Sequence, residues 1–228
     1  MVIVAVILFV AVALIALPQL WVHQTIERHA VDRPDLPGTG AEFARHVLDG
    51  MKLHDVKVET TELGNHYDPE ARAVRLEPRF YSGRSVSAVA IAAHEVGHAM
   101  QHAISLPMFE RRLIIAKQAH VIGLIAQAFL WSAPIFVILN KSVTALVLNI
   151  IGFGGMTLLS FALQAMTLPV EFDASFNRAM PLLRDGRFLE KSDLSAARQL
   201  LRAAAYTYVA ALIRSLLTLP LAGRGIRM

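Results

Sequence analysis

The sequence predicts a mostly α-helical integral membrane protein with about four transmembrane helices and a small α+β domain. Two observations lead to this expectation. The chain of 228 residues is 55% hydrophobic, which exceeds the usual content of a soluble domain. The apolar residues are concentrated in long uncharged blocks, and the charged residues gather between the blocks. The blocks therefore predict the membrane helices, and the charged segments predict the domain outside the membrane.

Three blocks are long enough to cross a hydrocarbon core of about 30 Å as helices: 2–22, 121–139 and 143–168. A fourth block, 203–221, contains Arg214 and several hydroxyl groups. It is either a fourth span or an amphipathic helix that lies in the membrane interface. If it spans, Arg214 is expected to face protein or to reach towards the interface.

The first block is interpreted as a retained anchor. A cleaved signal peptide carries positive charge ahead of its apolar run and a small-residue cleavage site after it. Here only Met1 precedes the block, and Leu-Pro-Gln-Leu-Trp-Val closes it. The anchor therefore places Trp21 at the predicted membrane interface.

The blocks divide the chain into five regions, in order an anchor (1–22), a polar region (23–119), a membrane hairpin (120–168), a second polar segment (169–202) and a C-terminal span with its tail (203–228). A tight turn at 140–142 joins the two helices of the hairpin, so both polar segments are expected on the same side of the membrane. They hold 12 and 6 of the 22 Lys and Arg residues. The positive-inside rule places this side in the cytoplasm.

The composition argues against cysteine-based sites and against nucleic-acid binding. The chain contains no cysteine, so it has neither a disulfide framework nor a thiolate metal site. The net charge of +4 is modest, and no pattern indicates nucleic-acid binding. We therefore expect a lipid bilayer, and not a nucleic acid, around or beside this chain.

The most informative pattern is HExxH, which occupies residues 94–98 inside an apolar stretch that predicts a buried helix. Positions i and i+4 lie on one helical face, so His94 and His98 can bind one zinc ion. Glu95 can then take a proton from a zinc-bound water. In the alternative, the three residues form a solvent-exposed face without a metal. It fits poorly, because the neighbours are nearly all apolar and a buried, unpartnered cluster would be costly.

A catalytic zinc ion usually has three protein ligands, and the third has two candidates. His102 continues the same helix, about 12 Å along the axis from His94, which is too far for ligands at about 2.0–2.1 Å. Glu171 begins the second polar segment, and Pro169 suits the start of a helical turn there. We therefore predict Glu171 as the third ligand and expect His102 beside the site or at an interface. An ordinary carboxylate at the membrane interface is the alternative for Glu171.

Two charged residues follow Glu171. Asp173 is poorly spaced to share its face, but it can hydrogen-bond a ligating imidazole. Arg178 is seven residues from Glu171 on the same helical face. It either pairs with a carboxylate, stabilises an oxyanion, or forms a plain structural salt bridge.

A pair of strands is predicted upstream of the HExxH motif. Residues 56–61 alternate apolar and polar side chains, 73–76 form a second short strand, and Asp68-Pro69 marks a turn. Zinc proteases commonly hold substrate as an added strand on a sheet edge. Polar groups for this purpose are expected from Asn65, His66 and Tyr67, although a lone histidine is usually a surface residue. A short helix is expected to begin near Thr39.

Three stretches, 65–69, 81–101 and 169–175, resemble the bacterial membrane-bound neutral zinc metallopeptidases, the YugP-like family. More distantly the chain is similar to the HtpX and CAAX-prenyl protease group of membrane gluzincins. These resemblances imply a zincin-like α+β catalytic domain with a small sheet, zinc bound by His94, His98 and Glu171, and Glu95 as general base. The distant group often has an aspartate four residues after its glutamate ligand, where this chain has Ser175.

The resulting hypothesis is a zinc metalloendopeptidase in the bacterial inner membrane, with several spans and an active site facing the cytoplasm. Its partners would be protein or peptide substrates in or near the membrane. The alternative is a non-catalytic membrane scaffold or adaptor that keeps a structural zinc. A structural zinc site should be closed by four protein ligands, whereas three convincing ligands are found in this sequence.

Overall fold

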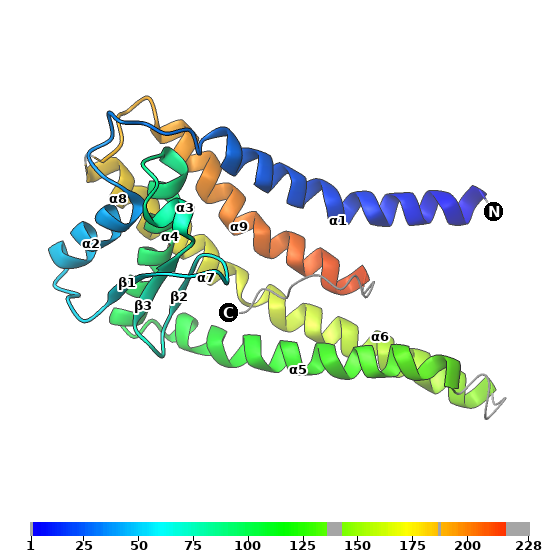
Figure 1. Ribbon diagram of the computed structural model, residues 1–228. Helices are drawn as coiled ribbons and strands as arrows, with labels where there is room; N and C mark the ends of the chain where they lie inside the picture. Colours follow the sequence, from blue (N-terminus) through cyan, green and yellow to red (C-terminus); the bar gives the residue numbers. More distant parts are fainter. Residues whose placement is uncertain (1, 136–142, 187, 218–228) are drawn as a thin grey trace.

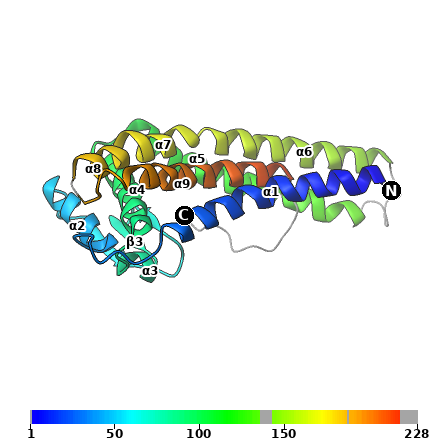
Figure 2. The ribbon, with the colours of Figure 1, turned by 90° about the horizontal axis from the view of Figure 1, so that it is seen from above.

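In the described part of the chain, four long helices extend from one end of a small domain (Figure 1). The structure is a computed structural model and describes residues 2–135, 143–186 and 188–217. The long helices are α1 (Val2–Arg28), α5 (Pro107–Ile135), α6 (Val143–Ala165) and α9 (Leu194–Leu217). α1 packs against α9, and α5 packs against α6. Viewed from above, the four helices run roughly along one direction (Figure 2).

Two helical stretches of the described chain, Pro107–Ile135 and Val143–Asp185, are long and apolar enough to cross a membrane. In the most apolar 18-residue segment of each stretch, only 11% and 17% is buried. Most of their apolar side chains therefore face outwards, unlike those of a soluble protein's core helix. The first stretch contains residues 121–135 of the predicted second span, whose last residues, 136–139, lie outside the described part, and the second stretch contains the whole predicted third span. The fourth predicted block runs to residue 221, and its last residues lie outside the described part, as does the predicted turn at 140–142.

Hydrogen bonds donated by side chains link α5 to α6. Asn149 Nδ2 donates to Ser132 Oγ over 2.8 Å, and Ser160 Oγ donates to the Ala119 carbonyl over 3.1 Å. Such bonds hold helices together where the surroundings offer little water. α5 leads away from the small domain and α6 returns to it (Figure 1). Both polar segments therefore lie at the same end of the molecule. That they share one side of a membrane stays a prediction.

The sheet has three strands, β1 (Lys57–Thr60), β2 (His66–Asp68) and β3 (Ala73–Leu76), in the order β1-β3-β2. β1 is parallel to β3, and β2 is antiparallel to it. The sequence predicts β1 and β3 but not β2, because three residues are too few to show an alternating pattern. The predicted turn after β2 is present, since Asp68 Oδ1 accepts from the backbone N–H groups of Glu70 and Ala71.

Helix α2 (Gly40–Gly50) begins where the sequence predicts. Thr39 Oγ1 accepts from the Glu42 N–H, and the Glu42 carboxylate accepts from the Thr39 N–H over 2.7 Å. This reciprocal capping satisfies two N–H groups that have no partner within the helix. The one-turn helix α3 (Pro78–Tyr81) follows the sheet and leads into the central helix.

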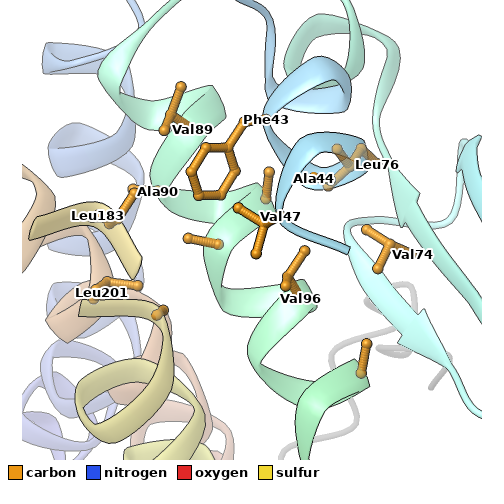
Figure 3. Packing of buried hydrophobic residues seen from close by; sticks show 14 of the residues in the cluster. Phe43, Ala44, Val47, Val74, Leu76, Val89, Ala90, Val96, Leu183 and Leu201 are labelled. Carbon is orange, nitrogen blue, oxygen red and sulfur yellow. The ribbon is translucent and has the colours of Figure 1, made fainter. Parts of the chain in front are cut away.

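Helix α4 (Val86–Ala103) forms the centre of the domain, and Ser85 caps its first turn. It packs against α2, β3 and α9. Figure 3 shows side chains from these elements converging on α4, with Phe43, Val74 and Leu201 among them. Apolar contact on several sides fixes the position and rotation of α4, and hence the direction of every side chain that it carries.

The second polar segment continues from α6 through α7 (Leu168–Phe172), the π-helix η2 (Asp173–Ala179) and α8 (Met180–Asp185). Pro169 lies in the first turn of α7, as the sequence predicts. η2 packs against α4. The segment therefore lies along the central helix α4, although the two are far apart in the chain. Gln101 on α4 and Val170 on α7, for example, are 69 positions apart and share a hydrogen bond.

Candidate metal centre

The HExxH motif lies in the middle of α4, where helical spacing puts its two histidines on one face. The residues His94, Glu95 and His98 are 4%, 6% and 3% exposed. The two imidazole rings lie edge to face, with centroids 4.7 Å apart. The solvent-exposed alternative is therefore wrong, because the packing of α4 buries this face.

Glu171 on α7 joins the two histidines and is completely buried. Its Oε2 atom lies 3.5 Å from His94 Nε2 and 3.3 Å from His98 Nε2. The ligand atoms of the three residues all lie within 4.8 Å of one another, and together they could hold a metal ion. The fold thus brings together the three side chains that the sequence singles out as metal ligands.

The arrangement fits a zinc ion. In a tetrahedral site with ligands at 2.0–2.2 Å, neighbouring ligand atoms are separated by about 3.3–3.6 Å, which matches the two distances to Glu171 Oε2. His98 Nε2 and Glu171 Oε2 are buried and make no hydrogen bond. Such atoms are costly unless something binds them. Burial by itself lowers the pKa of His94, but the Glu171 and Glu95 carboxylates outweigh it and raise that pKa, as expected for a site that attracts cations.

Arg112 on α5 compensates the buried charge of Glu171. Its Nη2 atom lies 2.6 Å from Glu171 Oε1, and its side chain is itself largely buried. The two oxygens of Glu171 are thus divided between two tasks. Oε1 faces the guanidinium group, and Oε2 faces the imidazoles.

The Nδ1 atom of each imidazole is in contact with a polar side chain. Ser175 Oγ lies 3.0 Å from His94 Nδ1, and Gln101 Oε1 lies 2.9 Å from His98 Nδ1. Partners of this kind fix the rotation of a metal-binding imidazole and decide which nitrogen carries the proton. Ser175, four residues after Glu171, contacts the His94 imidazole through its hydroxyl group.

The contact between α4 and η2 depends on Gly97 inside the motif. A Cβ atom at this position would lie 2.7 Å from the backbone oxygen of Ala174. The two segments that carry the clustered side chains are therefore in backbone contact. The wider π-helical turn begins at Asp173, directly after α7, and π-helical segments often occur at functional sites.

Asp173 and Arg178 bind each other. Arg178 Nε donates to Asp173 Oδ2 over 2.7 Å, and five residues separate them, the spacing that a π-helix stacks. Arg178 is thus in a salt bridge with a carboxylate, one of the options that the sequence leaves open. Asp173 does not contact an imidazole directly, because Gln101 lies between it and His98.

His102 lies on the last turn of α4 and outside the cluster of three. Its Nδ1 atom is 2.8 Å from the hydroxyl of Tyr67 on β2. Burial raises the pKa of Tyr67 to about 12, so this hydroxyl keeps its proton at physiological pH. Asn65 Oδ1 accepts from the Glu77 N–H, and His66 Nδ1 lies 2.8 Å from the Gly64 carbonyl. All four side chains have partners within the protein.

Sequence reasoning did not find the roles of Gln101 and Arg112. Gln101 follows His98 by three residues on one helix, so the spacing rule that relates the two histidines also relates this pair. No spacing pattern in the sequence points to Arg112. It lies in a different helix from both the motif and Glu171, and only the tertiary fold brings it to the carboxylate.

Comparison with known proteins identifies the family. The family model described as "Putative neutral zinc metallopeptidase" matches residues 3–222. The chain belongs to this family. "Putative membrane protease YugP" from Bacillus subtilis (strain 168) is 38% identical over 205 residues, which cover 88% of this chain and 86% of the relative. No solved structure matches the chain.

Membership of the neutral zinc metallopeptidase family confirms the resemblance to the YugP-like family. It also names the metal that suits the cluster of His94, His98 and Glu171. The name of the relative and the two exposed apolar stretches both support association with a membrane.

Proposed function

We propose that this protein is a membrane-embedded zinc endopeptidase of the gluzincin type, with His94, His98 and Glu171 as zinc ligands and Glu95 as general base. The single observation that carries the proposal is the buried cluster of three ligand atoms, in which Glu171 Oε2 is 3.3 and 3.5 Å from the two imidazoles. The family match supports zinc as the metal and peptides as the substrate class.

Glu95 supplies the acid–base chemistry in this proposal. It is buried beside His94 and is not needed as a ligand, since three other side chains occupy that role. When bound, zinc would polarise the scissile carbonyl and activate a water molecule. The Glu95 carboxylate takes the proton of the attacking water and delivers it to the leaving amine.

The peptide substrate binds along β2 in this proposal. β2 is at the edge of the sheet, and it packs against α4, which carries the motif. A peptide in extended conformation can pair with such an edge through its main chain. Asn65, His66 and Tyr67 have partners within the protein, so the backbone of β2, more than these side chains, is available to substrate.

We further propose four membrane spans, α1, α5, α6 and α9, with the small domain on the cytoplasmic side. α1 is 27 residues long and α9 is 24, which suffices to cross a hydrocarbon core. The three ligands then lie close to the ends of α5 and α6 that join the domain, because Glu171 on α7 follows α6 and pairs with Arg112 near the start of α5. Substrates would be membrane proteins or peptides close to the bilayer.

The alternative is a membrane scaffold that keeps a structural zinc ion. Structural sites usually have four protein ligands. Within the described ranges, the group of metal-binding side chains around Glu171 has three members. A three-ligand site leaves a coordination position for water, and this favours the enzyme.

The substitution Glu95→Gln tests the proposal, because it keeps the shape of the side chain and removes the base. Zinc content should stay near wild type, while peptide cleavage should fall by roughly 10²–10⁴-fold. Glu62→Gln, an exposed carboxylate in the same domain, is the matched control and should cleave normally. Wild-type cleavage should vanish with a strong chelator and return with zinc.

Three results would count against the proposal. Undiminished cleavage by zinc-loaded Glu95→Gln protein would refute the role of Glu95. Loss of zinc from this variant would make Glu95 a ligand or a support of the metal. A wild-type protein that binds zinc but cleaves no membrane or unfolded substrate would favour the scaffold.

A further inference from the structure

Gln101 is a fully buried amide that makes three hydrogen bonds. Its Nε2 group donates to the Val170 carbonyl and to Asp173 Oδ2, each over 2.9 Å. Its Oε1 atom lies 2.9 Å from His98 Nδ1. One side chain on α4 thus contacts an imidazole of the metal centre and, at the same time, the two residues that flank the Glu171–Phe172 pair.

The partners of Gln101 fix which way round its amide lies. A backbone carbonyl and a carboxylate can only accept, so the group between them must be the NH₂ group, which has two protons to donate. The oxygen is therefore the atom that faces His98. Since the amide oxygen can only accept, His98 Nδ1 must carry a proton.

A proton on Nδ1 leaves a lone pair on Nε2 in the neutral imidazole. Nε2 is the atom that faces Glu171 Oε2, 3.3 Å away. The other tautomer would place a proton on Nε2, pointing at this carboxylate. Histidine and glutamate could then hydrogen-bond each other, and neither atom would be available to a metal.

We infer that Gln101 is a positioning residue of the metal centre, which holds His98 in the tautomer that binds metal and prevents it from pairing with Glu171. The inference rests on the proposed function, because it takes His98 and Glu171 as ligands. Gln101 also holds the backbone carbonyl of Val170, the residue before Glu171. It therefore sets the imidazole and the third ligand relative to each other.

The test is zinc affinity, measured on full-length purified protein by competition with a chelator. Gln101→Met keeps the length of the side chain and removes all three hydrogen bonds. The variant should bind zinc roughly 10–100-fold more weakly, as is common when a residue that hydrogen-bonds a metal ligand is lost. Gln199→Met, at an exposed position of α9, is the matched control and should bind zinc like wild type.

A spectroscopic measurement separates this role from a merely structural one. In full-length protein stripped of metal, the ¹⁵N signals of His98, assigned by their loss in His98→Ala, report which nitrogen carries the proton. Wild type should show the proton on Nδ1, and Gln101→Met should shift it towards Nε2. Gln101→Leu also removes the amide oxygen and should shift the proton towards Nε2, which provides a second reading if Gln101→Met does not fold.

The outcomes are distinct. Wild-type protein with the proton on Nε2, or Gln101→Met with wild-type zinc affinity and tautomer, would overturn the inference and leave the proposed function intact. Zinc retained by His98→Ala would overturn the proposed function itself.

Discussion

Nη2 of Arg112 lies 2.6 Å from Oε1 of Glu171, and this ion pair joins the start of a membrane-length helix to the proposed metal centre. The carboxylate is completely buried, and the guanidinium group is nearly so. In such surroundings a lone charge is costly, and each member of the pair depends on the other. The pair also directs the second oxygen of Glu171 towards the two histidines.

Loss of Arg112 should therefore weaken both the fold and the metal centre. Arg112→Met leaves the Glu171 carboxylate without its partner, and we expect a loss of stability of about 3–5 kcal/mol in metal-free protein, measured by chemical unfolding in detergent. Zinc should restore part of this loss, because the ion compensates the same charge. Arg111→Met removes the exposed neighbour and should change neither quantity. Equal stabilities of the two variants would contradict this role of the ion pair.

Gly97 should tolerate no side chain. The Cβ atom of Gly97→Ala would meet the Ala174 backbone oxygen at 2.7 Å, and a backbone atom between two packed helices cannot move aside cheaply. We expect a destabilisation of about 1–3 kcal/mol, together with weaker zinc binding because α4 and η2 are pushed apart. Gly154→Ala on α6 meets nothing within 4 Å and serves as the control. Normal zinc affinity in Gly97→Ala would show that the close contact is not needed for the site.

The zinc content of purified variants distinguishes the proposed ligands from the residues near them. Purified wild-type protein should carry about one zinc ion per chain, and His94→Ala, His98→Ala or Glu171→Ala should each lose most of it. His102→Ala should keep its zinc, because His102 contacts Tyr67 and lies outside the cluster. If instead Glu171→Ala retained zinc and activity while His102→Ala lost them, the third ligand would have to be reassigned.

Membrane topology gives an independent check. Reporter domains inserted within 23–119 and within 169–202 should report the same side, because α5 and α6 form a hairpin between these segments (Figure 1). We expect the cytoplasmic side from the excess of Lys and Arg in both segments. Reporters on opposite sides would be incompatible with Glu171 next to His94.

What the sequence predicts well is local. The spacing of His94 and His98, the helix start at Thr39 and the turn at Asp68 each depend on a few neighbouring residues, and their physical rules are strong. Glu171 could be predicted although it is remote, because it begins a polar segment at a sharp change of composition. The strand β2 gave no pattern, since its pairing with β3 decides its conformation.

The supporting residues were harder to predict for a physical reason. Arg112 and Ser175 act through contacts between segments far apart in the chain, and no periodic pattern records such contacts. The π-helical turn of η2 also changes which residues share a face. It brings Arg178 to Asp173, five residues away, where a regular helix would stack residues three or four apart.

The order of these elements along the chain also matters while the protein is being made. A nascent chain leaves the ribosome with His94 and His98 first, and Glu171 follows only after both helices of the hairpin. At about 5–20 residues per second, this interval is on the order of seconds. The cluster cannot close until α5 and α6 have been synthesised, because Glu171 follows them in the chain. A chain that has been synthesised only as far as α5 therefore has two of the three side chains and cannot yet form the complete cluster.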